Sequence, residues 1–156
     1  FADPNGKTNI AKVVHAALAS RSSGVYVVTG ADEEKVIKAL SNKPVSFAHN
    51  PNFDQGISTS IRRGLSALPV DTDAVMMCLG NAPAPSTTTI NALISAFNPY
   101  QKQSLCVVLR NGHRDNPVLI GGRFFAELHE LEGDIGARYL IGAYPEEVAE
   151  IVMDSF

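Results

Sequence analysis

The chain lacks an excess of basic residues, since 13 Lys and Arg stand against 16 Asp and Glu over 156 residues and give a formal net charge of −3. Nucleic-acid backbones and anionic membranes attract clustered positive charge, so neither is an expected partner. The sequence also lacks an apolar run near the roughly 20 residues that cross a bilayer, and no basic-then-apolar leader opens it. We therefore expect a soluble, cytoplasmic protein that binds a small or phosphorylated ligand.

Cysteine is scarce, and the common catalytic motifs are absent. Cys78 and Cys106 lie inside apolar segments, with no CxxC or Cys/His spacing around them. We expect two buried free thiols rather than a disulfide or a metal site. The sequence holds no GxSxG, HExxH, GxxxxGK[ST] or GxGxxG. Hydrolase, zinc protease, P-loop and dinucleotide-binding functions therefore lack their usual signals.

What the sequence does contain is an alternation of short apolar segments with segments of helical spacing. Strands are predicted at 25–30, 45–49, 73–80, 104–110 and 148–155, with a polar turn at 111–116 and a short extended piece at 117–121. Helices are predicted at 10–18, 33–40, 57–68, 87–97 and 124–128, and a short one, entered through glycine, at 133–142. Alternation of this kind is typical of βαβ units. We predict one domain over 1–156, folded as a three-layer α/β/α sandwich with a mostly parallel sheet.

Ligands of open parallel sheets bind beyond the carboxyl ends of the strands, which directs attention to the loops there. In the 50–64 loop, Gly56 allows close backbone approach, Ser58 and Ser60 lie where a helix begins, and Arg63 follows within a turn. Such a helix start suits the ribose and phosphates of a nucleotide. A capped helix with surface arginines explains the same residues, and spacing alone favours that explanation while leaving the nucleotide site open.

Two further loops carry candidate residues. Asn81 and Pro83 follow the third predicted strand, where an acid would bind Mg²⁺ but an amide oxygen is a weaker, neutral ligand. Composition alone favours ordinary turn chemistry before a capped helix as the explanation of both residues. Asp134 lies between glycines with Arg138 nearby, which fits either a helix N-cap or a contact to a phosphate or pterin.

Taken in order, five segments resemble one known family: VYVVTG, NPNFDQGISTSIRRGLSAL, AVMMCLGNAPAPS, NPVLIGGRFFAEL and LEGDIGARYL. Together they are similar to the MobA-like nucleotidyltransferases, and most of all to the MocA-type molybdenum cofactor cytidylyltransferases. The resemblance spans nearly the whole chain. It implies a Rossmann-like nucleotidyltransferase fold that transfers CMP from CTP, or GMP from GTP, to the phosphate of molybdopterin with release of pyrophosphate.

The resemblance also assigns roles to the candidate residues. It implies Mg²⁺ as the cofactor, Asn81 at the metal and catalytic position, and Asp134 as a second catalytic residue. It places the nucleotide on Gly30, Gly56, Ser58, Ser60 and Arg63. It places the pterin on a further set of residues: Asn116, Pro117, Gly133 and Arg138.

Three departures from the family pattern qualify these expectations. The glycine-rich opening segment, which resembles LAAGxSxRMGxxK in the family, is not found here, so we expect an open sheet edge in this chain. The family turn reads approximately GDxP, whereas this chain reads GNAP, so Asn81 should weaken metal binding and lower activity by orders of magnitude. Asp115 stands before NPV where a glycine is usual.

Our leading hypothesis is therefore a nucleotidyltransferase-type domain of molybdenum cofactor biosynthesis, impaired by Asn81. Its expected partners are molybdopterin or another small phosphorylated ligand, and a molybdoenzyme or another protein of the cofactor pathway. The alternative is a non-catalytic nucleotide- or pterin-binding regulatory domain of a larger cofactor-handling protein. A sugar-nucleotide-forming transferase of the same fold is a third hypothesis.

Overall fold

The computed structural model describes residues 9–80 and 82–153. Its strands are β1 (Tyr26–Thr29), β2 (Ser46–His49), β3 (Ala74–Met77), β4 (Leu105–Arg110), β5 (His113–Gly121) and β6 (Val148–Val152). Its α-helices are α1 (Asn9–Leu18), α2 (Glu33–Ala39), α3 (Ile57–Ala67), α4 (Thr87–Ala96), α5 (Phe125–Glu130) and α6 (Arg138–Ala143). The predicted alternation of strands and helices is confirmed.

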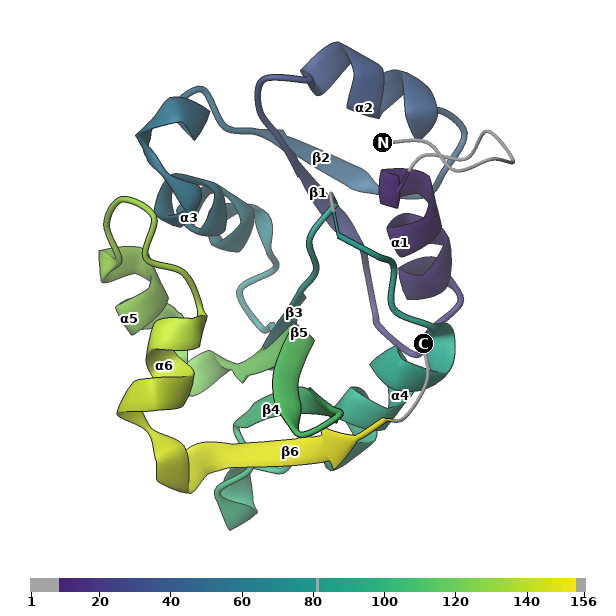
Figure 1. Ribbon diagram of the computed structural model, residues 1–156. Coiled ribbons are helices and arrows are strands. Elements are labelled where there is room, and N and C mark those ends of the chain that lie inside the picture. The colour runs from purple at the N-terminus through teal and green to yellow at the C-terminus, as the bar shows by residue number, and fades with distance from the viewer. Residues whose placement is uncertain (1–8, 81, 154–156) are drawn as a thin grey trace.

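Helices cover both faces of the strands and give the predicted three-layer α/β/α sandwich (Figure 1). On one face, α3, α5 and α6 pack their apolar side chains against Leu105, Val107, Val118 and Ile120 of β4 and β5. On the other face, Leu93 of α4 packs against Cys106 and Val108. Residues 105 to 108 all have 0% exposure, because a strand covered on both sides buries every side chain along its length.

The strands form two separate hydrogen-bonded groups. β1 pairs in parallel with β2, while the second group has the order β3-β5-β4-β6. Within it β4 and β6 are parallel and β5 alone runs opposite to its neighbours, so most strands share one direction. The core divides in the same way, since Val14, Val27 and Leu40 form a cluster of their own. Among the described strands, β1, β2, β3 and β6 each have one strand partner, whereas β4 and β5 have two.

The prediction of a polar turn over 111–116 is wrong. The turn consists of Asn111 and Gly112, with φ angles of 51° and 78°, and β5 already begins at His113. Two successive left-handed residues make the tight connection that an Asn-Gly pair favours between antiparallel strands. The polar residues after the turn therefore pair with β4, with Arg110 opposite His113 and Val108 opposite Asp115.

The helix predicted over 133–142 is also shorter than expected. It begins only at Arg138, and Ala137 occupies the N-cap position, so Asp134 is not an N-cap. Asp134 instead lies in an exposed turn. Within the described ranges 9–80 and 82–153, no helix is long and apolar enough to cross a membrane.

Candidate functional site

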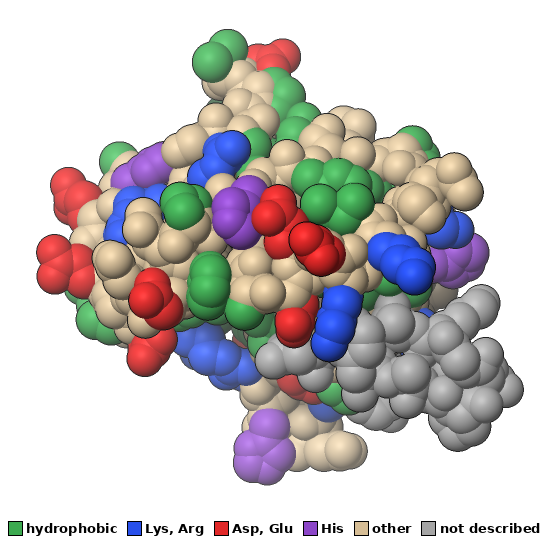
Figure 2. All heavy atoms as spheres, turned by 90° about the horizontal axis from the view of Figure 1, so that it is seen from above, with side chains coloured by type: hydrophobic (Ala, Val, Ile, Leu, Met, Phe, Trp, Pro, Cys, Tyr) green, Lys and Arg blue, Asp and Glu red, His purple; other side chains and the backbone are tan. Residues whose placement is uncertain are grey.

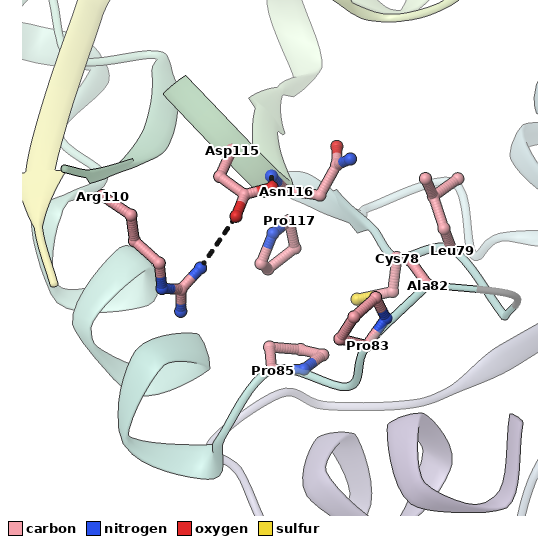
Figure 3. A pocket seen from close by; sticks show the side chains of 9 residues that line it. All are labelled: Cys78, Leu79, Ala82, Pro83, Pro85, Arg110, Asp115, Asn116 and Pro117. Carbon is pink, nitrogen blue, oxygen red and sulfur yellow. Dashed lines mark hydrogen bonds and ion pairs between the residues drawn. The ribbon is translucent and has the colours of Figure 1, made fainter. Parts of the chain in front are cut away.

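A small pocket opens at the carboxyl ends of β3 and β4, where the fold predicts a ligand. We call it the strand-end pocket, and its volume is about 100 Å³. Three segments enclose it: the end of β3, the loop that leads into α4, and the β4–β5 hairpin (Figure 3). Its lining residues are Cys78, Leu79, Ala82, Pro83, Pro85, Arg110, Asp115, Asn116 and Pro117.

Strand alternation explains why polar groups of β4 and β5 reach this pocket. Side chains two residues apart share a face, so Arg110 lies on the α4 face of the sheet with Cys106 and Val108. Asp115 stands opposite Val108 and therefore belongs to the same face. The register then shifts between Val107 and Val108, which leaves Asn116 and Pro117 as extra residues on β5. A bulge of this kind re-aims side chains, and here it brings residues 115 to 117 to the pocket.

The α4 side of the pocket is formed by the loop that precedes this helix. Pro83 and Pro85 restrict the chain to extended conformations. The hydroxyl of Ser86 then accepts a hydrogen bond from the backbone N–H of Thr89 at 3.1 Å and caps α4, as its position in the sequence predicts. Apolar, rigid walls thus face the polar groups of the hairpin.

Arg110 and Asp115 are the charged residues of the strand-end pocket. Arg110 is 8% exposed, and its Nη1 lies 3.3 Å from Oδ2 of Asp115. The other carboxylate oxygen, Oδ1, accepts a hydrogen bond from the backbone N–H of Asn116 at 2.8 Å. Cys78 remains an uncharged thiol, because burial raises its pKa from 9.0 to about 11. The pocket therefore combines one buried cation with one anion.

A second cluster joins the loop before α3 to the loop before α6. The carbonyl oxygen of Gly133 accepts hydrogen bonds from the backbone N–H of Ser58 at 3.1 Å and from its hydroxyl at 2.8 Å. Gly56 approaches the same peptide so closely that a Cβ on it would lie 2.1 Å from that oxygen. We call this contact the Gly56–Gly133 junction. It brings together residues 75 positions apart in the chain.

Several residues that were expected to bind a nucleotide form hydrogen bonds within the protein. Ser58 is fully buried with its hydroxyl on Gly133, so it presents no surface to a ligand in this conformation. The hydroxyl of Ser60 accepts a hydrogen bond from the side-chain amide of Asn50 at 2.9 Å. Nε of Arg63 donates to the carbonyl of His49 at 3.0 Å. This network holds the start of α3 against the end of β2.

Gly30 lies at the end of β1 beside an exposed aromatic ring. A Cβ on Gly30 would come within 2.9 Å of Cβ of Phe53, whose side chain is 45% exposed. Next to it, Nδ1 of His49 lies 3.1 Å from the hydroxyl of Thr29 and 3.3 Å from a carboxylate oxygen of Glu33. The ends of β1 and β2 therefore present an open, mixed polar and aromatic surface.

The residues expected on the pterin side do not stay together. Asn116 and Pro117 line the strand-end pocket, whereas Gly133 lies at the Gly56–Gly133 junction, and Asp134 and Arg138 are exposed near it. Asn81 lies outside the described residues. The roles assigned to all of these residues remain predictions.

Arg110 was not among the predicted site residues. One signal was available, because it is the charged residue that ends the otherwise apolar strand LCVVLR. A single charge at a strand end is common, and its burial depends on the neighbouring strands. The family resemblance marks Asp115 as irregular, and the structure pairs it with Arg110.

The described residues do not by themselves make a magnesium site. Within 9–80 and 82–153, no group of three or more His, Cys, Asp or Glu residues is placed to hold a metal ion. In the strand-end pocket, Asp115 is the one carboxylate among the lining residues, and the guanidinium beside it repels a cation.

The fold and the pocket define an α/β domain with a pocket at the carboxyl ends of its strands. Residues 1–148 match the MobA-like NTP transferase domain, and the chain belongs to this family. Its three-layer fold is accordingly the Rossmann-like nucleotidyltransferase fold, and its class is that of the nucleotidyltransferases.

Individual relatives are more distant. The bifunctional protein GlmU of Pseudomonas syringae pv. syringae is 29% identical over 104 residues, which are 67% of this chain and 22% of that protein. The chain thus matches about a fifth of this curated relative. A nucleotidyl transferase from Methanothermobacter superposes with a TM-score of 0.81 at 22% identity, covering 97% of this chain and 72% of the other. Rv0371c of Mycobacterium tuberculosis, in complex with manganese, superposes with a TM-score of 0.78 at 17% identity, covering 96% of this chain and 78% of the other.

Proposed function

We propose that this nucleotidyltransferase domain transfers CMP, or GMP, from CTP or GTP to the phosphate of molybdopterin, with release of pyrophosphate. The observation that carries the proposal is the strand-end pocket, which lies at the carboxyl ends of the strands, where open α/β sheets bind their ligands. The five ordered segments described above favour molybdopterin over a sugar phosphate as the acceptor. Cytoplasmic CTP and GTP would supply the donor, and a molybdoenzyme or another protein of the cofactor pathway would receive the product.

The reaction is the attack of a phosphate oxygen of the acceptor on the α-phosphorus of the nucleotide. A bond forms between these two atoms, the bond from the α-phosphorus to the bridging oxygen breaks, and that oxygen leaves with pyrophosphate. Catalysis of phosphoryl and nucleotidyl transfer depends mostly on positioning and charge stabilisation. In this chain the rigid walls at Pro83, Pro85 and Pro117 position a ligand, and Arg110 supplies a fixed positive charge.

A divalent cation is part of the proposal through the nucleotide, because Mg²⁺ binds largely through substrate phosphates. The manganese complex of the mycobacterial neighbour supports a role for a divalent metal. The described residues do not by themselves form a site for the metal, so the nucleotide phosphates would hold it.

Titration calorimetry of the full-length chain with CTP and with GTP, each with and without MgCl₂, tests the donor. We expect heat of binding for one nucleotide and a dependence on the metal. A pyrophosphate-release assay with molybdopterin and with a sugar 1-phosphate then tests the acceptor. Absence of binding at millimolar nucleotide would refute the proposal.

The second candidate is a non-catalytic nucleotide- or pterin-binding regulatory domain. Asn81, which stands where the family has its acid, favours it. Asn81→Asp in the full-length chain separates the two functions. A gain of metal-dependent transfer supports an impaired enzyme, whereas nucleotide binding without any gain in transfer supports the regulatory domain.

A further inference from the structure

We propose that a second pocket, at the opposite end of the strands from the strand-end pocket, binds a flat aromatic heterocycle whose edge carries N–H donors beside a carbonyl acceptor. Guanine and pterin share such an edge. We call this hollow the far-edge pocket, and its volume is about 420 Å³. Its lining includes Asp73, Phe97, Tyr100, Ser104, Gly121 and Arg123. The site is argued from these residues and does not depend on the proposed function.

The position of the far-edge pocket follows from the strand order. β3 begins at Ala74, β4 begins at Leu105 and β5 ends at Gly121, so the pocket lies where β3 and β4 start. The strand-end pocket lies at the other end of the same strands, where Arg110 ends β4. The six residues of β4 span about 20 Å of extended chain. A ligand in one pocket therefore leaves the other pocket open.

A buried hydroxyl group lines the far-edge pocket without a hydrogen-bond partner. Ser104 has 0% exposure, and no group within the described ranges 9–80 and 82–153 hydrogen-bonds its Oγ. Its backbone is fixed by the sheet, because its carbonyl oxygen accepts a hydrogen bond from the N–H of Gly121 at 2.7 Å. An unpaired buried hydroxyl destabilises a fold, so a polar ligand group that reached it would gain an interaction that the protein does not supply.

One wall of the far-edge pocket is an aromatic ring that faces solvent. Tyr100 is 96% exposed. The loop that carries it is closed, because Asn98 and Gln103 exchange two backbone hydrogen bonds of 3.0 Å, and Pro99 restricts the backbone just before the ring. An exposed ring on a closed loop is a stacking surface that exists before a ligand arrives.

The rim of the far-edge pocket carries one carboxylate and one guanidinium. Asp73 is exposed, and its carboxylate makes no hydrogen bond or ion pair with another described residue. Nη1 of Arg123 donates to Glu147, and the guanidinium carbon lies 4.9 Å from the centre of the Phe124 ring, so the side chain is held in place. Because this side chain is still 54% exposed, its remaining N–H groups can reach a ligand.

These groups match the polar edge that guanine and pterin have in common. A carboxylate accepts two parallel N–H bonds, which the ring N–H and the neighbouring amino group of such a heterocycle provide. The ring carbonyl beside them accepts a hydrogen bond from a guanidinium such as that of Arg123. Cytosine has one amino group flanked by acceptors, so it lacks the pair of donors. The pocket volume of about 420 Å³ lies in the usual range for sites of small organic ligands.

An uncharged ring suits the far-edge pocket better than a polyphosphate does. The chain has a formal net charge of −3, and Figure 2 shows acidic and basic side chains interspersed over the face seen from above, outside the grey atoms. Charges of mixed sign cancel at a distance, so a ligand is recognised by local contacts. Locally, the carboxylates of Asp73 and Glu147 outnumber the guanidinium of Arg123 and disfavour an anion.

The test is a nuclear magnetic resonance titration of the full-length chain. Guanosine, 6-hydroxymethylpterin and cytidine are added separately, and none of them carries a phosphate. The backbone amides of Ser104, Gly121 and Gly122 report on the far-edge pocket. Those of Arg110 and Asn116 report on the strand-end pocket, so the signals that shift identify the pocket that is occupied.

Two substitutions at the pocket and one matched control accompany the titration. Tyr100→Ala removes the stacking ring, and Asp73→Asn removes the carboxylate. Asp71→Asn is the control, because Asp71 is an exposed acid of the same loop that does not line the pocket. We expect each pocket variant to weaken binding of the heterocycle roughly tenfold and the control to change it less than about twofold. The replaced side chains are exposed, so lost binding would not reflect unfolding.

The outcomes decide both the pocket and the class of ligand. Shifts of the Ser104, Gly121 and Gly122 amides with guanosine alone assign the pocket to a guanine base, shifts with the pterin alone assign it to a pterin, and shifts with both support the shared edge. An equal response to cytidine would overturn the assignment of that edge. No shift of these amides at millimolar ligand, or equal effects of all three substitutions, would overturn the site.

These outcomes are separable from the fate of the proposed function. A chain that transfers no nucleotide but shows the shifts at the far-edge pocket retains the second site. A chain that transfers nucleotide but shows shifts only at the strand-end pocket keeps the proposed function and loses the second site.

Discussion

Replacement of Gly56 by alanine should be among the most damaging single changes outside the core. Gly56 has φ 111° and ψ 164°, a conformation that is essentially restricted to glycine and costs other residues roughly 1–3 kcal/mol. The new Cβ would lie 2.1 Å from the carbonyl oxygen and 2.2 Å from the carbonyl carbon of Gly133. Because both atoms belong to the backbone, the two loops must separate, and Ser58 loses two hydrogen bonds worth about 1 kcal/mol each. We expect a total loss of about 3–5 kcal/mol in the free energy of unfolding.

Gly112→Ala is the matched control for this prediction. Gly112 also has a positive φ, 78°, but a Cβ there would meet nothing within 4 Å. Gly112→Ala should therefore lower the free energy of unfolding only by the cost of placing alanine in a left-handed backbone conformation, about 1–2 kcal/mol. The effect of alanine on the unfolded chain is common to both variants and cancels in the comparison. Urea denaturation followed by circular dichroism measures both, and a Gly56→Ala variant no less stable than Gly112→Ala would refute the steric reasoning.

Three other predictions concern the cap of α4, a buried thiol and the sheet edges. Ser86→Ala should lower the free energy of unfolding by about 1 kcal/mol because α4 loses its N-cap. Ser66→Ala is the control, because the Ser66 hydroxyl donates to a carbonyl within α3, and it should change the free energy of unfolding by less than about 0.5 kcal/mol. Equal urea midpoints for the two variants would contradict this prediction. Burial raises the pKa of Cys106 from 9.0 to about 11, so the unfolded chain releases this proton first and stability falls as pH rises through that window. Between pH 8 and 10.5 the free energy of unfolding, measured by urea denaturation, should fall by about 2 kcal/mol more in the wild type than in Cys106→Ala. If the free energy of unfolding falls equally with pH in both proteins, this thiol is not responsible. In native-state hydrogen exchange, amides of β4, which has strand partners on both sides, should be protected longest, and those of β1 and β3 should exchange sooner; equal protection would mean that the sheet is continuous in solution.

The elements that could be predicted are those whose signal is local. Ile57, Ile61 and Leu65 lie one helical turn apart and place α3 almost to the residue. Ser86 precedes such a pattern and caps α4 as expected. Both signals depend on residues within a few positions of each other, so they need no knowledge of the rest of the chain.

The two errors have a common cause. The polar segment after Gly112 reads as a loop, but pairing with β4 makes residues 113–116 part of a strand. The segment from Gly133 reads as the start of a helix, but the Gly133 carbonyl is held by Ser58 and the helix is delayed to Arg138. In both cases a hydrogen-bond partner from elsewhere in the chain overrides local propensity.

The same distinction between local and long-range contacts separates what could and could not be predicted of the candidate site. The sequence pointed to the loops at the carboxyl ends of the strands, because strand direction is visible in it, and the family resemblance marked Asn116, Pro117 and Asp115. It could not show that Ser58 is buried, that Gly133 lies on Gly56 rather than at the strand-end pocket, or that Arg110 faces Asp115.

By itself, the sequence determined the layers of the fold, the order of its strands and helices, and the edge at which a ligand is expected, since these follow from the periodicity of apolar residues and the direction of parallel strands. Only the tertiary structure decided which polar groups share that edge. The bulge in β5 and the junction between loops 75 residues apart set those neighbours, and contacts of such kinds depend on how the packed elements meet rather than on any local pattern.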